Sequence, residues 1–329
     1  MADRALTLDI DQPPKARRVE FAVVLGLVAF VALFAVGSIY AGIGQVWAHL
    51  TALPASLILG MLALSLLNYA LRAWRWQIFC DGLGLPVPWA RNALYFVAGF
   101  ALTMSPGKAG EAIRLWFLQR CHGYPYERAA PMFIGDRLSD SLAILLLCLA
   151  GIGAFAGYAV YALVVAALVL IAILMLARPA PLLSIVLWVW GASGRRQPRL
   201  FAKIRHAIRG TRAILSPHLS GVGLILALIG WTAEVLAFQW LVTTLGTEIS
   251  LQQAAFVFCF AMIAGTIAML PGGLGGTEAT MLALLALLNV PLDQAVVATA
   301  VIRLTTLWFA TVLGLMVLPA TLRLARSRR

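Results

Sequence analysis

The sequence predicts an all-α integral membrane protein with about six full transmembrane helices and two re-entrant broken-helix hairpins, arranged as an inverted repeat. Three observations lead to this fold class. Of the 329 residues, 62% are hydrophobic and only 12% are charged, a balance that soluble globular domains do not have. Two Gly-rich breaks, Ser105–Glu111 and Leu270–Glu278, interrupt long apolar stretches. Lysine and arginine are unevenly distributed between the two halves of the chain, which indicates how each half is oriented.

Each break should form a non-helical turn with a carboxylate just beyond it, because proline lacks a backbone donor and glycine relaxes the backbone. Hydrocarbon tolerates such backbone only where protein or a water-filled cavity shelters it. Broken helices at corresponding places in two halves of a chain indicate a transport site. The residues of the breaks that we predict to line this site are Pro106, Gly107, Gly110, Glu111, Pro271, Gly272, Gly273, Gly275, Gly276 and Glu278.

The first membrane repeat is predicted to cover residues 21–178, after a polar cytoplasmic tail at 1–20. The apolar run after the tail is too long for the core of a cleaved signal peptide and is expected to remain as the first helix. The hairpin is expected because its two apolar pieces are each too short to cross a bilayer comfortably. The predicted segments are full spans at 21–43, 53–76, 130–155 and 157–177, and a hairpin made of 91–104 and 112–120.

A basic connector at residues 179–218 separates the repeats, and apolar residues recur at helical spacing among the charges of its 195–212 segment. This pattern suits a helix that lies on the inner leaflet against anionic head groups. A linker that only sets the topology is the alternative. The second repeat (219–320) and a basic cytoplasmic tail (321–329) follow. Within the second repeat we predict full spans at 220–244 and 294–318, and a hairpin made of 252–270 and 277–289.

The two halves share a weak internal repeat, in which prolines, glutamates and arginines recur in the same order. Aligning the breaks pairs Pro106 with Pro271, Glu111 with Glu278, Pro125 with Pro291 and Arg137 with Arg303. Six lysines and arginines lie between Arg72 and Arg137, whereas none lies between Arg212 and Arg303. Loops rich in these residues stay in the cytoplasm. The first hairpin is therefore predicted to enter from the cytoplasm and the second from outside, with both termini cytoplasmic.

Charges inside predicted spans are the other candidates for a site, since a charge at the bilayer centre costs about 2.5–3.5 kcal/mol and must find a partner. We predict that the substrate-binding set includes Arg72, Arg114, Asp136, Arg137, Asp140, Glu234 and Arg303. For Asp136, Arg137 and Asp140, which share a helical face, the alternative is an internal salt bridge. For the carboxylates of the two breaks, the alternative is simple helix capping.

Arg303 is the lone charge in its predicted span, and a lipid phosphate would supply the anion that it needs. Arg72, Arg75 and Arg114 have a plainer alternative as interfacial anchors. The first two belong to Arg72–Trp76, a basic and aromatic segment typical of a membrane interface.

The net charge of +12 does not indicate a nucleic-acid partner, because the basic residues lie at the ends of apolar segments, as membrane topology requires. The four cysteines and four histidines are scattered along the chain. Their spacing matches no zinc site or disulfide framework, so we expect no metal and no cofactor.

At these landmarks the sequence resembles the lysylphosphatidylglycerol synthase transmembrane (flippase-like) family over about residues 20–320. The resemblance implies a polytopic lipid translocase of the bacterial inner membrane. Bifunctional members carry a soluble aminoacyl-transfer domain after the membrane part, whereas this chain stops at Arg329, so we expect no synthetase activity. The motifs on which the resemblance rests are Arg72–Trp76, the run from Pro106 to Arg114, the cluster from Asp136 to Asp140 and the run from Pro271 to Glu278.

The leading hypothesis is a translocase, not an enzyme, that moves an anionic phospholipid or glycolipid between leaflets. Arg137 and Arg303 would hold its phosphate. One alternative is an intramembrane enzyme that modifies lipid head groups, although no Ser/His or Cys/His pattern supports it. Another is a non-transporting partner of a lipid-modifying enzyme. The expected partners are the lipid substrate and the bilayer, with a homodimer or a lipid-synthesising enzyme as further options. The head group, the direction and the energy source stay open.

Overall fold

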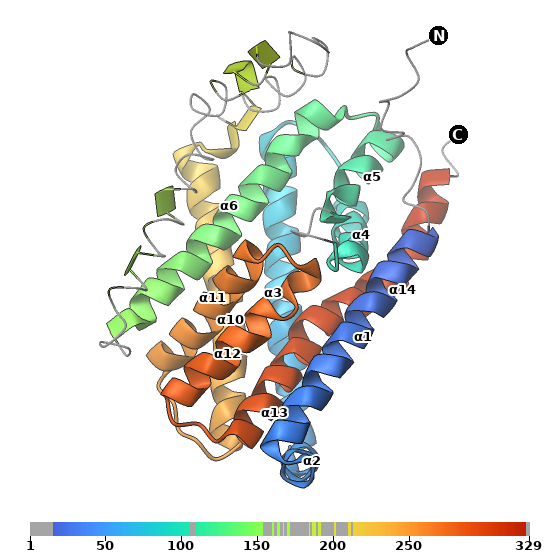
Figure 1. Ribbon diagram of the computed structural model, residues 1–329. Helices are drawn as coiled ribbons and strands as arrows, with labels where there is room; N and C mark the ends of the chain where they lie inside the picture. The colour runs from blue at the N-terminus through green and yellow to red at the C-terminus, as the bar shows by residue number, and fades with distance from the viewer. Residues whose placement is uncertain are drawn as a thin grey trace.

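The computed structural model describes residues 16–105, 110–153, 213–326 and isolated positions between 160 and 211. These residues form helices and no strand, in agreement with an all-α membrane protein (Figure 1). Pro106 and Gly107 lie outside the described residues, as do most of the predicted span 157–177 and most of the basic segment 195–212. The helices of the first half are α1 (Ala16–Ala41), α2 (Ile43–Ala52), α3 (Ala55–Gly82), α4 (Trp89–Gly99), η1 (Phe100–Leu102), α5 (Ile113–His122) and α6 (Tyr126–Gly151).

The second half repeats this plan and ends in a longer helix. Its helices are α10 (Pro217–Thr244), α11 (Leu251–Ile267), η4 (Pro271–Gly273), α12 (Gly276–Leu287), α13 (Leu292–Arg303), η5 (Leu304–Trp308) and α14 (Phe309–Arg326). The last three are continuous through a π-helical turn, η5. By length and composition, four helical stretches of the described chain can cross a membrane: Val23–Ala41, Ala55–Gly82, Pro217–Thr244 and Leu292–Arg326.

Two details differ from the prediction. The sequence did not indicate α2, which begins where Gly42 turns the chain with a φ of 89°, a value that glycine adopts without strain. The span predicted at 53–76 continues to Gly82. The Arg72–Trp76 segment therefore lies inside a helix and does not end it. Arg72, Arg75 and Trp76 are buried, so the prediction that this segment is an interfacial anchor is wrong.

From α3 and α10 onward, the helices of the two halves follow each other in the same order. α3 and α10 each have 28 residues, and the next helix starts seven positions after each one ends, from 82 to 89 and from 244 to 251. A broken helix follows in each half: α4 and α5 in the first, α11 and α12 in the second. Pro125 and Pro291, which the sequence repeat aligned, are the N-caps of α6 and α13.

The two halves exchange contacts. α3 packs along α10, α6 packs on α11 and α14 packs on α4, so α6 of the first half and α14 of the second each cover the broken helix of the other half. Glycine allows the backbones to approach at both places. A Cβ at Gly151 would collide with the backbone of Gln252 on α11, and a Cβ at Gly314 would collide with the backbone of Ala101 in η1.

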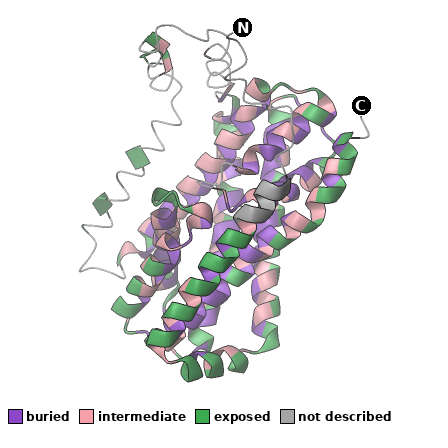
Figure 2. Cartoon of the chain, turned by 45° about the vertical axis from the view of Figure 1, so that its right-hand side comes forward, coloured by how far each residue is buried: buried purple, intermediate pink, exposed green. Residues whose placement is uncertain are grey.

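The broken helices approach the middle of the molecule from opposite ends. In Figure 1, α4 and α5 lie in the upper half, and α11 and α12 lie in the lower half. The outer surface is strongly apolar. Figure 2 shows α1 as a largely exposed helix, on which Val28 is 59% and Ile39 is 64% exposed. In a soluble protein such a surface would aggregate, whereas lipid solvates it.

We expect Gly151→Ala and Gly314→Ala each to destabilise the protein by about 1–3 kcal/mol, because the added methyl group meets backbone that cannot move aside. Thermal unfolding in detergent measures the loss. The matched control is Gly221→Ala on α10, where a Cβ would meet nothing within 4 Å. This control should be neutral or slightly stabilising. Equal melting temperatures for the three variants would contradict the exchange of close contacts between the halves.

Candidate functional site

Seven charged side chains from three helices and one turn meet inside the first half. We call them the first ionic cluster. α3, the turn before α5, α5 itself and α6 supply its members, which are Arg72, Arg75, Glu111, Arg114, Asp136, Arg137 and Asp140.

The centre of the cluster joins α3 to α6. Arg75 Nη2 lies 2.5 Å from Asp136 Oδ1 and 2.7 Å from Asp140 Oδ1. Arg72 Nη2 lies 3.0 Å from Asp140 Oδ2. Arg137 reaches Asp136 on its own helix at 2.6 Å. The salt-bridge interpretation of the α6 charges is therefore correct, but their partners come largely from elsewhere in the chain.

Arg114 links the first break to this centre. It is fully buried, donates from Nε to the carbonyl of Phe96 and places its guanidinium 3.9 Å from the centre of the Phe96 ring. Its Nη2 lies 3.0 Å from Glu111 Oε2. A buried, stacked arginine is not an interfacial anchor, so this alternative is wrong for Arg114 as well. Glu111 also accepts a hydrogen bond from Thr103 at 3.2 Å.

The first break is tightly folded at its described end. The N–H of Gly110 donates to Ser105 Oγ at 2.6 Å. A Cβ at Gly110 would lie 2.7 Å from Leu102 Cβ and 2.8 Å from the Leu102 carbonyl oxygen. Glycine is therefore required at this position for space.

The second break depends on backbone conformations that other residues rarely adopt. Gly272, Gly273 and Gly275 have φ values of 64°, 70° and 85°, in the left-handed region that favours glycine. Pro271 begins the 3₁₀ turn η4 before them, and Gly276 begins α12 after them.

Arg303 and Glu278 close the second break. Arg303 Nε lies 2.6 Å from Glu278 Oε1, and Arg303 Nη2 donates to the Gly272 carbonyl at 2.7 Å. Glu278 also accepts from the N–H of Gly275 at 2.6 Å, so it caps α12. Arg303 is the lone charge in its predicted span, but the anion that it needs comes from Glu278 on the preceding helix, α12, and not from a lipid phosphate. Spacing along one helix cannot indicate such a partner.

The same pair recurs in the first half. Arg137 Nη2 lies 3.2 Å from Glu111 Oε2, as Arg303 pairs with Glu278. The sequence repeat aligned these residues, and the structure gives them equivalent contacts. In each half, a carboxylate just after the break is bound by an arginine of the helix that follows the broken helix, α6 in the first half and α13 in the second.

The first ionic cluster carries a surplus of positive charge and of donors. Four arginines meet three carboxylates, which gives a formal charge of +1. Some of its buried donors also have no hydrogen-bond partner among the described residues: Arg72 Nε, Arg75 Nη1, Arg114 Nη1 and Arg137 Nε. Arg137 is the most exposed of the four arginines, with 26% of its side chain accessible. Surplus buried donors of this kind favour an anion.

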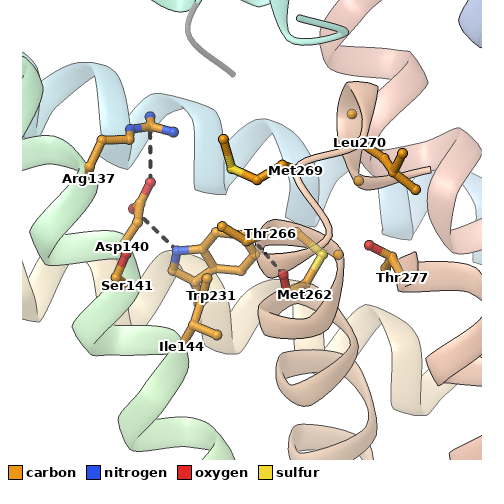
Figure 3. A pocket seen from close by; sticks show the side chains of 13 residues that line it. Arg137, Asp140, Ser141, Ile144, Trp231, Met262, Thr266, Met269, Leu270 and Thr277 are labelled. Atoms are coloured by element: carbon orange, nitrogen blue, oxygen red, sulfur yellow. Dashed lines mark hydrogen bonds and ion pairs between the residues drawn. The ribbon is translucent and has the colours of Figure 1, made fainter. Parts of the chain in front are cut away.

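Arg137 opens into a pocket of about 670 Å³ that the second break closes on the other side (Figure 3). Trp231 donates to Asp140 at 3.2 Å and forms part of the pocket wall. Met269, Gly272, Gly273 and Thr277 contribute the opposite side. The pocket therefore connects a cation of the first half with the turn of the second.

A second pocket of about 450 Å³ lies between the two Glu–Arg pairs and shares Trp231 and Met262 with the first. It brings Glu234 together with members of both halves. Glu234 accepts hydrogen bonds from Asn68 at 2.9 Å and from Ser65 at 3.2 Å. The charged residues that line the pocket are Arg72, Glu111, Glu234 and Arg303.

Sequence reasoning missed the neutral members of these pockets. Trp231 and Met262 are ordinary in apolar spans and carry no signal. Ser65 and Asn68 are polar residues inside an apolar span, a signal that would have indicated buried partners. Tyr69 donates to the carbonyl of Thr306, in the π-helical turn η5, where the change of helical register alters the backbone pairing.

An apolar groove of about 300 Å³ runs between α1, α12 and α13 and ends beside Glu278. Phe30, Phe34 and Leu282 line it, together with the buried Thr299. Its lining suits a hydrocarbon chain rather than a polar molecule.

Comparison with known proteins gives consistent matches. Residues 20–314 match the family described as lysylphosphatidylglycerol synthase TM region. A UPF0104 membrane protein of Methanothermobacter thermautotrophicus is 24% identical over an alignment of 320 positions that covers 90% of this chain and 94% of the relative. The UPF0104 membrane protein PH1989 of Pyrococcus horikoshii is 24% identical over an alignment of 280 positions that covers 77% of this chain and 83% of the relative.

The match to the family covers all the helices that build the two breaks, the first ionic cluster and both polar pockets. This chain therefore belongs to the lysylphosphatidylglycerol synthase transmembrane-region family, a family of membrane proteins with a lipid-related role.

Proposed function

We propose that this protein is a translocase that moves an anionic phospholipid or glycolipid between the leaflets of the membrane. The observation that carries the proposal is the surplus of positive charge in the first ionic cluster, inside an otherwise apolar protein. A buried cation without a full set of anions is costly in a membrane. A phosphate that enters through the Arg137 pocket would supply the missing negative charge and accept hydrogen bonds.

The path for the head group runs from the Arg137 pocket, past Trp231 and Met262, to the pocket between the Glu–Arg pairs. Both breaks border this path, as expected for transport between half-helices. The groove beside α1 offers a place for an acyl chain next to Glu278. Because the arginines and hydroxyls that line the path suit reversible binding of an anion, we propose that the lipid leaves chemically unchanged and that the protein is not an enzyme.

The distribution of charge supports a topology with both termini in the cytoplasm. α1 begins and α14 ends at the end of the molecule where α4 and α5 lie (Figure 1). Loops and helix ends there carry exposed arginines, whereas the opposite end carries Glu248 and Asp293. By the positive-inside rule, the first broken helix enters from the cytoplasm and the second from outside. The exposed arginines are Arg91, Arg120, Arg128, Arg323 and Arg326.

We expect Arg137→Gln to slow lipid exchange about tenfold or more, since a charge-assisted hydrogen bond to phosphate contributes about 1.5–3 kcal/mol. The measurement uses purified protein in liposomes with fluorescent phospholipids, and follows their accessibility to an impermeant quencher. Arg91→Gln, which changes an exposed arginine outside the pockets, is the matched control and should exchange lipid like the wild type. Wild-type exchange by Arg137→Gln would refute this path.

We expect Arg303→Gln to lower stability by about 3–5 kcal/mol, because it leaves the buried Glu278 without a cation. The double variant Arg303→Gln/Glu278→Gln removes both charges and should recover part of the loss in melting temperature. Lipid exchange should stay slow in the double variant, because the hydrogen bond to Gly272 is altered in both proteins. A single variant that melts like the wild type would show that the pair does not hold the second break.

A further inference from the structure

Glu234 differs from every other buried carboxylate among the described residues because no arginine binds it. It lies in the middle of α10 and is 2% exposed. Its two hydrogen-bond donors, Ser65 and Asn68 on α3, are neutral. Within the described chain, no basic nitrogen lies within ion-pair distance of it. The other buried carboxylates, Glu111, Asp136, Asp140 and Glu278, each have an arginine within 3.2 Å.

The internal repeat places Glu234 where the first half has an arginine. α3 starts at Ala55 and α10 at Pro217, and both have 28 residues. Arg72 and Glu234 each stand seventeen positions after the first residue of their helix. Arg72 is held by Asp140 at 3.0 Å, whereas Glu234 has neutral donors alone. The two halves therefore differ in charge at equivalent positions.

The partners of Glu234 suit both of its protonation states. An ionised carboxylate accepts from the Ser65 hydroxyl and from Asn68 Nδ2. A protonated one still accepts from Asn68 through one oxygen and can donate through the other, because a serine hydroxyl is both a donor and an acceptor. A proton can therefore enter or leave without breaking an ion pair. At Asp136, by contrast, protonation would disrupt contacts with Arg75 and Arg137.

The surroundings favour a proton over a metal cation. Arg72 and Arg303 line the same pocket as Glu234 and would repel a second cation, and Asn68 presents an N–H rather than an oxygen to the carboxylate. α10 packs against α3, α6, α11 and α13, and Glu111 lies across the pocket. The titratable and charged groups on these four helices are Tyr69, Arg72, Arg75, Cys80 and Asp81 on α3, Tyr126, Glu127, Arg128, Asp136, Arg137, Asp140 and Cys148 on α6, Cys259 on α11, and Asp293 and Arg303 on α13.

We infer that Glu234 is a proton-binding site that couples lipid movement to proton movement, an inference that rests on the proposed function. A phosphate between Arg72 and Arg303 would repel an ionised Glu234 in the same pocket. Binding of the anion and uptake of one proton therefore strengthen each other, and this coupling is reciprocal. The step forms one O–H bond at Glu234, with the proton taken from water on one side of the membrane and released to water on the other.

The first test does not depend on transport. Infrared difference spectra of the protein in detergent, recorded between low and high pH, should contain a carboxylic acid band that titrates. Glu234→Gln should remove this band, and Glu248→Gln, which changes an exposed glutamate, should keep it. A spectrum of Glu234→Gln identical to that of the wild type would overturn the inference. Asn68→Ala is a second variant. It should move the midpoint of the titration of this band to higher pH, because the ionised carboxylate loses a hydrogen-bond donor. An unchanged midpoint would also contradict the inference.

The second test uses liposomes with a pH gradient and a fluorescent anionic lipid. For one proton per lipid, a gradient of one pH unit should bias the distribution of the lipid by up to about tenfold. Glu234→Gln should abolish this bias, and Glu248→Gln should retain it. If Glu234→Gln moves lipid with an unchanged bias, the inference is wrong and the proposed function stands. If the wild type moves no lipid while the infrared band still depends on Glu234, the proposed function is wrong and the proton site stands.

Discussion

Non-helical backbone inside a membrane protein needs a partner for every exposed N–H and C=O group, because hydrocarbon offers none. The Glu278–Arg303 pair meets this need at the second break. Arg303 binds the carbonyl of Gly272, Glu278 binds the N–H of Gly275, and the two side chains neutralise each other. Glu111 and Arg137 repeat the pairing at the first break. The turn of the second break depends on the Glu278–Arg303 pair, and Glu111 and Arg303 both line the pocket between the two halves.

A helix of each half packs on the broken helix of the other half, and this packing brings the two breaks together. α14 covers α4, and α6 covers α11, so neither broken helix is held by its own half alone. Backbone contact at Gly151 and Gly314 fixes how closely the halves approach. Small residues serve this purpose in membrane proteins, where helix association depends on close packing rather than on the hydrophobic effect. The pockets form at the junction that this packing creates.

The two halves are similar in shape but differ in charge. The first half carries a surplus cation, the second half has a neutral pair at its break, and Glu234 lies between them without an arginine. A cavity whose charges are all neutralised would attract an anion only weakly. A group of cations without carboxylates would bind the anion too tightly to release it. One surplus positive charge beside a carboxylate that can change its charge is a balance that suits a transport site.

The sequence by itself determined the membrane class, the two breaks and the internal repeat, because these depend on local properties. Long apolar runs, the special backbone of proline and glycine, and the spacing of landmarks are all readable along one chain. The same signals identified nearly every charged residue of the site. They missed Arg75, left Arg72 and Arg114 with an interfacial alternative that their burial rules out, and did not indicate that Glu278 is the partner of Arg303.

Only the tertiary structure decided which charge meets which. Asp136 and Arg75 are 61 positions apart in the chain and Asn68 and Glu234 are 166 apart, so no helical period relates them. The neutral residues that separate and line the pockets gave no signal, since tryptophan and methionine are common in apolar spans. Local sequence sets where a helix breaks and what charge it carries. The packing of distant helices sets the partner of a buried charge. Because the membrane interior contains no water to solvate the charge, it must pair with another side chain.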